Sequence, residues 1–284
     1  MLTSLVRLTL LAAPCAALLS RGAEAQVVNV PQTSAVIGVN VLIGGLTATT
    51  WALIRHRDPA RAFAFGALGG ATHFAGKYVA SRRGTLSGWS GLLLSATGSS
   101  MVTNAGAGVA PLEDISIPIA SLRVHLRPAA HGARVSVNAY ETVMILHYAT
   151  RQDLDIDWPR TLQTGTLVAH TDDDIVLDGD QAIDGVTYGP AIVVERVGRE
   201  VPANVWKHEG THVLQNYFEQ DAWGIPIEDA VRKHLPMPML RRIPDWIDIG
   251  IATYFIRAAN IVLLGRYHGL DNLVEGEAYF MERR

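Results

Sequence analysis

Charge is scarce in the first part of this sequence and ordinary in the rest. Residues 1–112 hold ten of the 51 charged residues, eight of them Lys or Arg, whereas residues 113–284 hold 41, with an excess of acidic side chains. The formal net charge of −3 at pH 7 is small, and no basic stripe interleaved with aromatic residues occurs. We therefore expect no binding of nucleic acid, and we expect a boundary near Leu112 to separate two regions of different character.

Cysteine is nearly absent, since Cys15 is the only one in the chain. It lies within residues 1–25, in which Arg7 precedes the apolar run Leu8–Leu19. The segment ends in Ala23-Glu24-Ala25, the A-x-A pattern of a signal-peptidase site. We interpret residues 1–25 as a secretory signal peptide; the alternative is an uncleaved first membrane helix. Cleavage leaves no thiol, which excludes disulfides and cysteine catalysis and suits export to the periplasm or the membrane of a bacterial cell envelope.

Three long uncharged runs, rich in Gly and Ala, fill residues 26–112. The first run, residues 35–54, is long enough to cross a bilayer as a helix. Small residues recur four apart, which lets helix backbones approach closely. The few charges are mostly basic and lie between the runs, at Arg55, Arg57, Arg61, Lys77, Arg82 and Arg83. We predict three helices joined by basic turns and associated with a membrane over residues 35–110; the alternative is tight packing within a soluble protein.

The pattern changes to short alternating segments beyond Leu112. Period-2 alternation of Val, Ile and Thr between Pro, Gly and Asp predicts strands over residues 115–126, 133–138, 143–148, 166–170 and 191–196. From Pro202 the pattern is helical, and the apolar run Ile247–Leu264 favours a buried or interfacial helix. We predict an α+β fold: a Gly/Ala-rich helical region over residues 26–112, then a domain over 113–284 with a small antiparallel β section and a helical core.

One motif of this second region carries chemistry. His208-Glu209-x-x-His212 is flanked by uncharged Trp206 and Val213 and by apolar Val205 and Leu214, as expected for a helix buried on one side. Residues four apart share a helix face, so both imidazoles can reach one metal ion. Glu209, one step round the helix, can contact a water molecule bound to that ion. The motif therefore predicts a Zn²⁺ site with His208 and His212 as ligands and Glu209 as a general base.

The motif and its flanks resemble those of the zincin metallopeptidases, over about ten residues. The metzincin branch does not fit, because Gln215 and Phe218 stand where its pattern continues with Gly and His. Resemblance to the gluzincin branch implies a third ligand from a later helix, and Glu275-Gly276-Glu277-Ala278 offers the E-x-x-A part of the gluzincin pattern, with Tyr279 in place of Asp. Glu275 is the preferred ligand and Glu277 the alternative; residues two apart point to different helix faces, so one of them can bind and the other cannot.

The resemblance implies a zinc-dependent metallopeptidase of the cell envelope, which hydrolyses peptide bonds with a metal-activated water and Glu209 as base. Its partners are peptide or protein substrates, and the apolar run Ala191–Val194 would supply an edge strand that holds them extended. The alternative is a catalytically silent relative in which the metal is structural. For the residue that stabilises the oxyanion, the sequence offers Tyr217, His234, His268 and Tyr279 without choosing among them.

Overall fold

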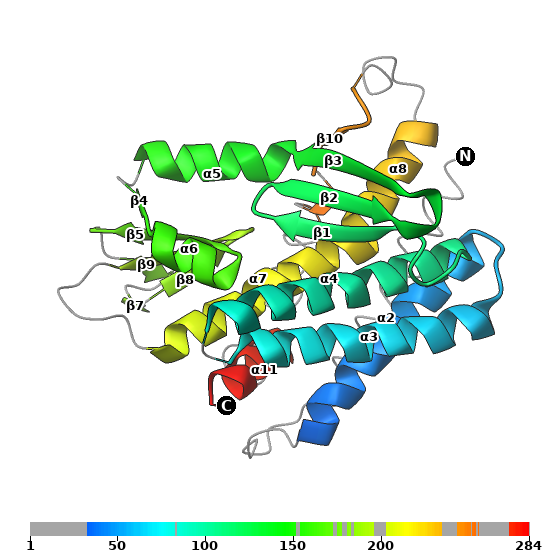
Figure 1. The fold of residues 1–284 in the computed structure, drawn as a ribbon, viewed down its shortest axis with the longest axis horizontal. Helices are drawn as coiled ribbons and strands as arrows, with labels where there is room; N and C mark the ends of the chain where they lie inside the picture. The colour runs from blue at the N-terminus through cyan, green and yellow to red at the C-terminus, as the bar shows by residue number, and fades with distance from the viewer. Residues whose placement is uncertain are drawn as a thin grey trace.

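The computed structural model describes residues 33–82, 84–151, 154–172, 175–177, 181–182, 185–195, 203–234, 243–250, 252–253, 255 and 273–283. The predicted signal peptide lies outside these residues, as does most of the predicted helix over 247–264. The chain has the predicted α+β fold: long helices pack beside two small sheets (Figure 1).

Three long helices form the N-terminal part, as the uncharged runs predict. They are α2 (Thr33–Ile54), α3 (Pro59–Ala80) and α4 (Thr85–Ala107). Asp58 begins α3, because its side chain accepts hydrogen bonds from the backbone N–H groups of Ala60 and Arg61, at 3.0 and 3.2 Å. Gly108 ends α4 in the left-handed conformation, with φ of 75°.

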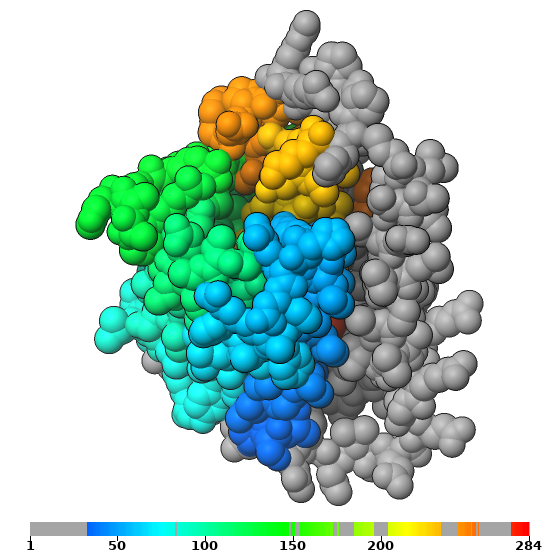
Figure 2. Space-filling view, turned by 90° about the vertical axis from the view of Figure 1, so that its right-hand side faces the viewer, coloured from blue at the N-terminus to red at the C-terminus, as the bar shows by residue number. Residues whose placement is uncertain are grey.

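Glycines bring α2 and α3 into backbone contact. A Cβ atom on Gly70 would lie 2.1 Å from the backbone oxygen of Asn40, and one on Gly44 would lie 2.4 Å from that of Gly66. Real Cβ contacts are essentially never below 3.0 Å, so larger residues would push the helices apart. The small residues four apart therefore form a close helix interface, and α2 and α3 (blue to light blue) form one unbroken surface in Figure 2.

The sequence interpretation of Lys77 as part of a basic turn is wrong. Helix α3 continues to Ala80, and Lys77 is buried within it, with 2% of its surface exposed. Its Nζ lies 2.5 Å from Oε2 of Glu277 and donates to Oδ1 of Asn40 at 2.9 Å. These contacts offset the cost of burying an ammonium group, and they come from residues that are remote in sequence.

Two mixed four-stranded sheets and a short hairpin form the β part. The first sheet has the order β1-β2-β3-β10, from Ile115–Ile119, Leu122–Arg127, Gly132–Asn138 and Ile247–Asp248. The second has the order β4-β5-β9-β8, from Asp155–Ile156, Leu167–Thr171, Ala191–Glu195 and Gly185–Tyr188. The hairpin joins β6 and β7, Val176–Leu177 and Gln181–Ala182.

Two predictions for this part need correction. The β section is not purely antiparallel, because β3 pairs with β10 and β5 with β9 in parallel; both β5 and β9 are largely apolar runs, as buried parallel strands are. Residues 143–148, predicted as a strand, lie in helix α5 (Ala139–Arg151). Asn138 caps that helix, since its Oδ1 accepts from the backbone N–H of Glu141 at 2.9 Å, and the cap outweighs a six-residue alternation.

Helix α7 (Ala203–Glu219) joins the two parts of the chain in one core. On one side Val213, Leu214 and Tyr217 pack with Leu92 of α4 and with buried residues of β5 and β9. Further along, Phe218 packs with α2, α3 and α4 residues. A π-helical turn, Gln220–Gly224, and α8 (Ile225–His234) continue α7, while α11 (Leu273–Glu282) lies beside it. The short helix α6 (Trp158–Thr164) packs on α4.

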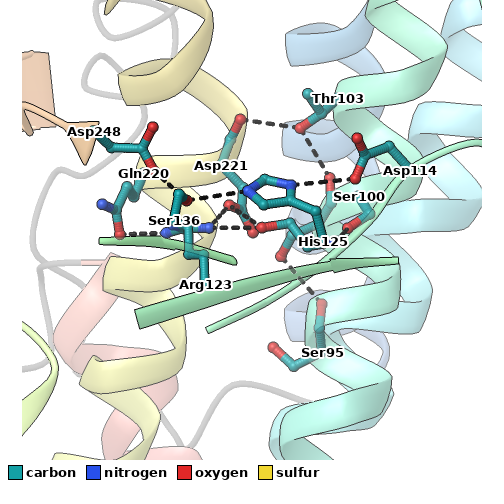
Figure 3. A network of polar contacts seen from close by, with 12 residues as sticks. Ser95, Ser100, Thr103, Asp114, Arg123, His125, Ser136, Gln220, Asp221 and Asp248 are labelled. Carbon is teal, nitrogen blue, oxygen red and sulfur yellow. Dashed lines mark hydrogen bonds and ion pairs between the residues drawn. The ribbon is translucent and has the colours of Figure 1, made fainter. Parts of the chain in front are cut away.

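A buried polar network ties the first sheet to the end of α7 (Figure 3). The guanidinium of Arg123, on β2, is 1% exposed and contacts Asp221, Gln220 and Ser116. In the same network His125 bridges Asp114 and Ser136, at 3.2 and 3.3 Å.

The bonding order of Ser136, His125 and Asp114 is that of a serine-hydrolase triad. However, Ser136 is fully buried and its hydroxyl donates to Asp248 at 2.7 Å. A hydroxyl closed off in this way is no accessible nucleophile, so the network is structural.

Candidate metal centre

The two motif histidines lie one turn apart on α7, as their spacing predicts. Their Nε2 atoms are 3.1 Å apart, and the rings meet edge to face with centroids 4.8 Å apart. Both side chains are 14% exposed. The helix therefore presents two imidazole nitrogens to one point that solvent reaches.

Glu275, in the first turn of α11, completes the group. Its Oε2 lies 3.2 Å from Nε2 of His208 and its Oε1 lies 3.3 Å from Nε2 of His212. Three ligands at about 2.0–2.1 Å from a tetrahedral zinc ion lie roughly 3.3 Å from one another. The two nitrogens are 3.1 Å apart, and each lies 3.2–3.3 Å from a different oxygen of Glu275. Two imidazoles and one carboxylate therefore converge closely enough to hold one ion, and they are donors that zinc prefers.

Each histidine has a hydrogen-bond partner on its other nitrogen. Nδ1 of His208 lies 3.2 Å from Oε2 of Glu282, whose other oxygen accepts from Asn204 at 2.9 Å. Nδ1 of His212 lies 2.9 Å from Oε1 of Gln215. Because these partners accept, each Nδ1 donates to them, which directs each Nε2 towards Glu275, where its lone pair would be available to a bound ion.

Glu277, the alternative third ligand, lies away from the two histidines. Its Oε1 accepts from Asn40 at 2.7 Å, and its Oε2 accepts from Lys77 at 2.5 Å and from Gln215 at 2.8 Å. The side chain is 9% exposed. The carboxylate of Glu277 thus faces α2 and α3, whereas the carboxylate of Glu275, two residues earlier on the same helix, faces the histidines.

Glu209 is held beside the histidines by the strand β8. Its side chain is buried, and Oε2 accepts a hydrogen bond of 2.7 Å from the hydroxyl of Thr187. The same hydroxyl lies 3.0 Å from the backbone oxygen of Glu209. This neutral hydroxyl donor orients the carboxylate without placing a positive charge beside it.

The electrostatics couple Glu275 to the two histidines. Burial raises the pKa of Glu275, but hydrogen bonds from His208 and His212 outweigh it and hold that pKa far below the ordinary range. Burial lowers the pKa of His212, yet the hydrogen bond to Glu275 and the charges of Glu275 and Glu209 bring a net increase. In the metal-free protein, positive charge is therefore favoured between these carboxylates, at the place where a cation fits.

The edge strand next to the site is β8, and the prediction that Ala191–Val194 would be an edge is wrong. These residues belong to β9, which is buried and pairs with β5 on one side and β8 on the other. A nearly continuous apolar run is typical of a central strand. Among the described strands β8 ends the sheet order, and it carries the Thr187 that contacts Glu209.

Among the oxyanion candidates that the structure describes, Tyr279 is in contact with a motif histidine. Its ring packs edge to face on His208, with centroids 4.7 Å apart. Burial and the charges of Glu275, Glu282 and Glu209 raise the pKa of Tyr279, so its hydroxyl keeps the proton. Tyr217 is 2% exposed within the core, His234 ends α8, and His268 lies outside the described residues.

Several residues of this centre escaped the sequence analysis. Glu282 follows Glu275 by two helical turns and Gln215 follows His212 by one, so helical spacing alone signals both. Nothing local signals Thr187, Asn40 or Lys77, because each reaches the centre through tertiary packing. Comparisons with protein-family models, with curated proteins and with solved structures found no match.

Proposed function

We propose that this chain is a zinc-dependent hydrolase of peptide bonds, exported to the bacterial cell envelope. The observation that carries the proposal is the convergence of His208, His212 and Glu275, whose donor atoms lie close enough to hold one ion. The carboxylate of Glu209 lies beside them and is not one of these three donors. A purely structural zinc site is usually closed by four protein ligands. Among the described residues the site has three protein donors beside Glu209, which favours a site that keeps one position for water.

The residues around the ion have distinct roles. A bound Zn²⁺ supplies Lewis acidity, which lowers the pKa of water towards about 7 and polarises a carbonyl group. Glu209 accepts the proton of the attacking water and later delivers it to the leaving amine. Thr187 keeps Glu209 in place, while Glu282 and Gln215 keep the histidine Nε2 atoms directed at the ion.

Strand β8 supports a peptide as the substrate. An extended peptide can add to the edge of a sheet through backbone hydrogen bonds. On β8 such a peptide would lie beside Thr187 and therefore beside Glu209, with its carbonyl groups close to the three ligands. The ring of Tyr279 packs on His208, which supports its hydroxyl as the donor to the oxyanion that would form.

The decisive experiment is the substitution Glu209→Gln in the full-length chain. This variant retains all three ligands, so we expect it to bind one zinc ion as the wild type does, while hydrolysis of an unstructured protein substrate falls by at least about 100-fold. Zinc content is measured by elemental analysis and hydrolysis by the appearance of new amino termini. Glu219→Gln, at the far end of the same helix, is the matched control and keeps full activity.

The alternative function is a metal-stabilised protein without catalysis. It predicts zinc in the wild type but no hydrolysis of any peptide, with Glu209→Gln without effect. Glu275→Ala separates both functions from a chance motif, because it removes a ligand and should abolish zinc binding. A wild-type protein that binds no zinc at pH 7 would rule out both.

A further inference from the structure

Glu277 connects the metal centre to the N-terminal helices. Its carboxylate is nine-tenths buried and receives three donors from three different helices: Asn40 of α2, Lys77 of α3 and Gln215 of α7. Lys77 also donates to Asn40, which closes the cluster on itself. A buried carboxylate and a buried ammonium group thus meet within the core, far apart in sequence.

The same cluster continues to His212. Gln215 donates through Nε2 to Glu277 and to the backbone oxygen of Val274, at 2.8 and 3.1 Å. Both partners are acceptors, so the amide can have only one orientation, and its Oε1 faces Nδ1 of His212. An unbroken chain of contacts therefore runs from Lys77 through Glu277 and Gln215 to one ligand of the centre.

We infer that Lys77 is a positioning residue for the metal centre: with Asn40 it fixes Glu277, and Glu277 holds the Gln215 amide that sets the tautomer and orientation of His212. This inference rests on the proposed metal site. It makes α2 and α3 part of the centre. Without Lys77, the carboxylate would remain buried with no compensating charge. The carboxylate and the amide bound to it would then change position, and His212 would lose its fixed acceptor.

The test is zinc affinity in the full-length Lys77→Met variant, which keeps the length of the side chain and every ligand. We expect zinc to bind about 10- to 100-fold more weakly than to the wild type, the usual effect of losing an outer hydrogen-bond partner of a ligand. Affinity is measured by competition with a fluorescent chelator. The control is Arg123→Met, which breaks an equally buried ion pair with Asp221 that contacts no ligand; we expect it to lower thermal stability and to keep zinc affinity.

Two further variants make the result independent of how well Lys77→Met folds. Gln215→Met removes the acceptor of His212 and leaves the Lys77–Glu277 pair intact, so it should weaken zinc binding similarly. Adding Lys77→Met to it should cause no further loss of affinity, because both changes act through the same amide. The pair Lys77→Met with Glu277→Gln removes both charges but keeps an acceptor for Gln215, and should restore much of the affinity.

A metal-free measurement separates this inference from the proposed function. At a pH high enough to keep His212 neutral, nitrogen-15 shifts of the imidazoles should show its proton on Nδ1 in the metal-free wild type and a mixture of tautomers in Lys77→Met. Wild-type zinc affinity together with an unchanged His212 tautomer in Lys77→Met would overturn the inference and leave the proposed function standing. A wild type that binds no zinc would overturn the proposed function, and the tautomer would still decide whether Lys77 positions His212.

Discussion

Thr187 is the residue on which the orientation of the proposed base depends. Its hydroxyl contacts both the carboxylate and the backbone oxygen of Glu209, at 2.7 and 3.0 Å. The contact joins the strand β8, along which we place the substrate, to the helix that carries the ligands. The side chain of Thr187 would therefore fix the position of the proposed base relative to a peptide bound along β8.

Replacing Thr187 by Val should separate catalysis from metal binding. Val has nearly the same shape but no hydroxyl, so Glu209 loses its donor while the three ligands are unchanged. We expect kcat to fall about tenfold or more, since general-base catalysis contributes about 10²- to 10⁴-fold, with unchanged zinc affinity. Steady-state kinetics and chelator competition measure the two effects. Thr187→Ser, which keeps a hydroxyl, is the control, and equal kcat in Val and Ser variants would contradict this role.

At this scale the sequence predicts what lies within one or two helical turns. The spacing of His208, Glu209 and His212 determines that they share α7, whatever surrounds the helix. The same reasoning says that only one of Glu275 and Glu277 can face the histidines, but the choice depends on how α11 is rotated against α7. That rotation follows from the contacts of Lys77 and Asn40 with Glu277. The sequence around residue 277 gives no sign of these two partners, because both are remote in the chain.

Among the elements, α2 and α3 depend on glycines that have no room for a side chain. A Cβ atom added to Gly70 would lie only 2.1 Å from the backbone oxygen of Asn40. Asn40 is also a donor to Glu277, so the close approach of the two helices sets one side of the cluster described above. By contrast, a Cβ atom on Gly38, in α2 as well, would meet nothing within 4 Å.

Gly70→Ala and Gly38→Ala should therefore have opposite effects on the free energy of unfolding. Gly70→Ala forces backbone apart and should destabilise the protein by about 1–3 kcal/mol or more. Gly38→Ala replaces a helical glycine in open space and should stabilise by about 0.5–1 kcal/mol. Thermal and denaturant unfolding of the two variants under identical conditions measures the difference. A similar change in both variants would refute the close contact between α2 and α3.

The elements themselves were predictable where the pattern is long and failed where it is short. The three long uncharged runs correspond to the three helices α2, α3 and α4. Residues 143–148 are helical, because an alternation over only six residues is a weaker signal than the helix cap that Asn138 provides. Parallel pairing of β5 with β9 joins segments separated by β6, β7 and β8, and an alternation pattern read along one strand contains no information about its neighbour.

At the scale of the whole molecule, the helical part buries polar side chains among its apolar ones and exposes leucines. Buried side chains of α2 and α3 include Asn40, His73 and Lys77, all below a tenth exposed, whereas the outer face of α2 carries Leu42 and Leu46 at 50% and 42% exposure. Among the described residues, α2 is the one helix whose length and hydropathy suit a membrane span; its 22 residues rise about 33 Å, close to the roughly 30 Å of a bilayer core. Paired polar groups inside and leucines outside favour contact with lipid.

We therefore expect the protein, produced as the full-length chain in a bacterial host, to sediment with membranes and to resist extraction with alkaline carbonate. Replacing Leu42, Leu46 and Leu53 together by Gln removes the exposed leucines of α2 and should release most of the protein into the soluble fraction, because each polar amide placed in lipid lacks a hydrogen-bond partner. Leu162→Gln, on α6, changes a leucine that is 63% exposed outside these helices and should leave the protein in the membrane. Recovery of the wild type in the soluble fraction without detergent would show that the outer leucines of α2 face water or another protein instead.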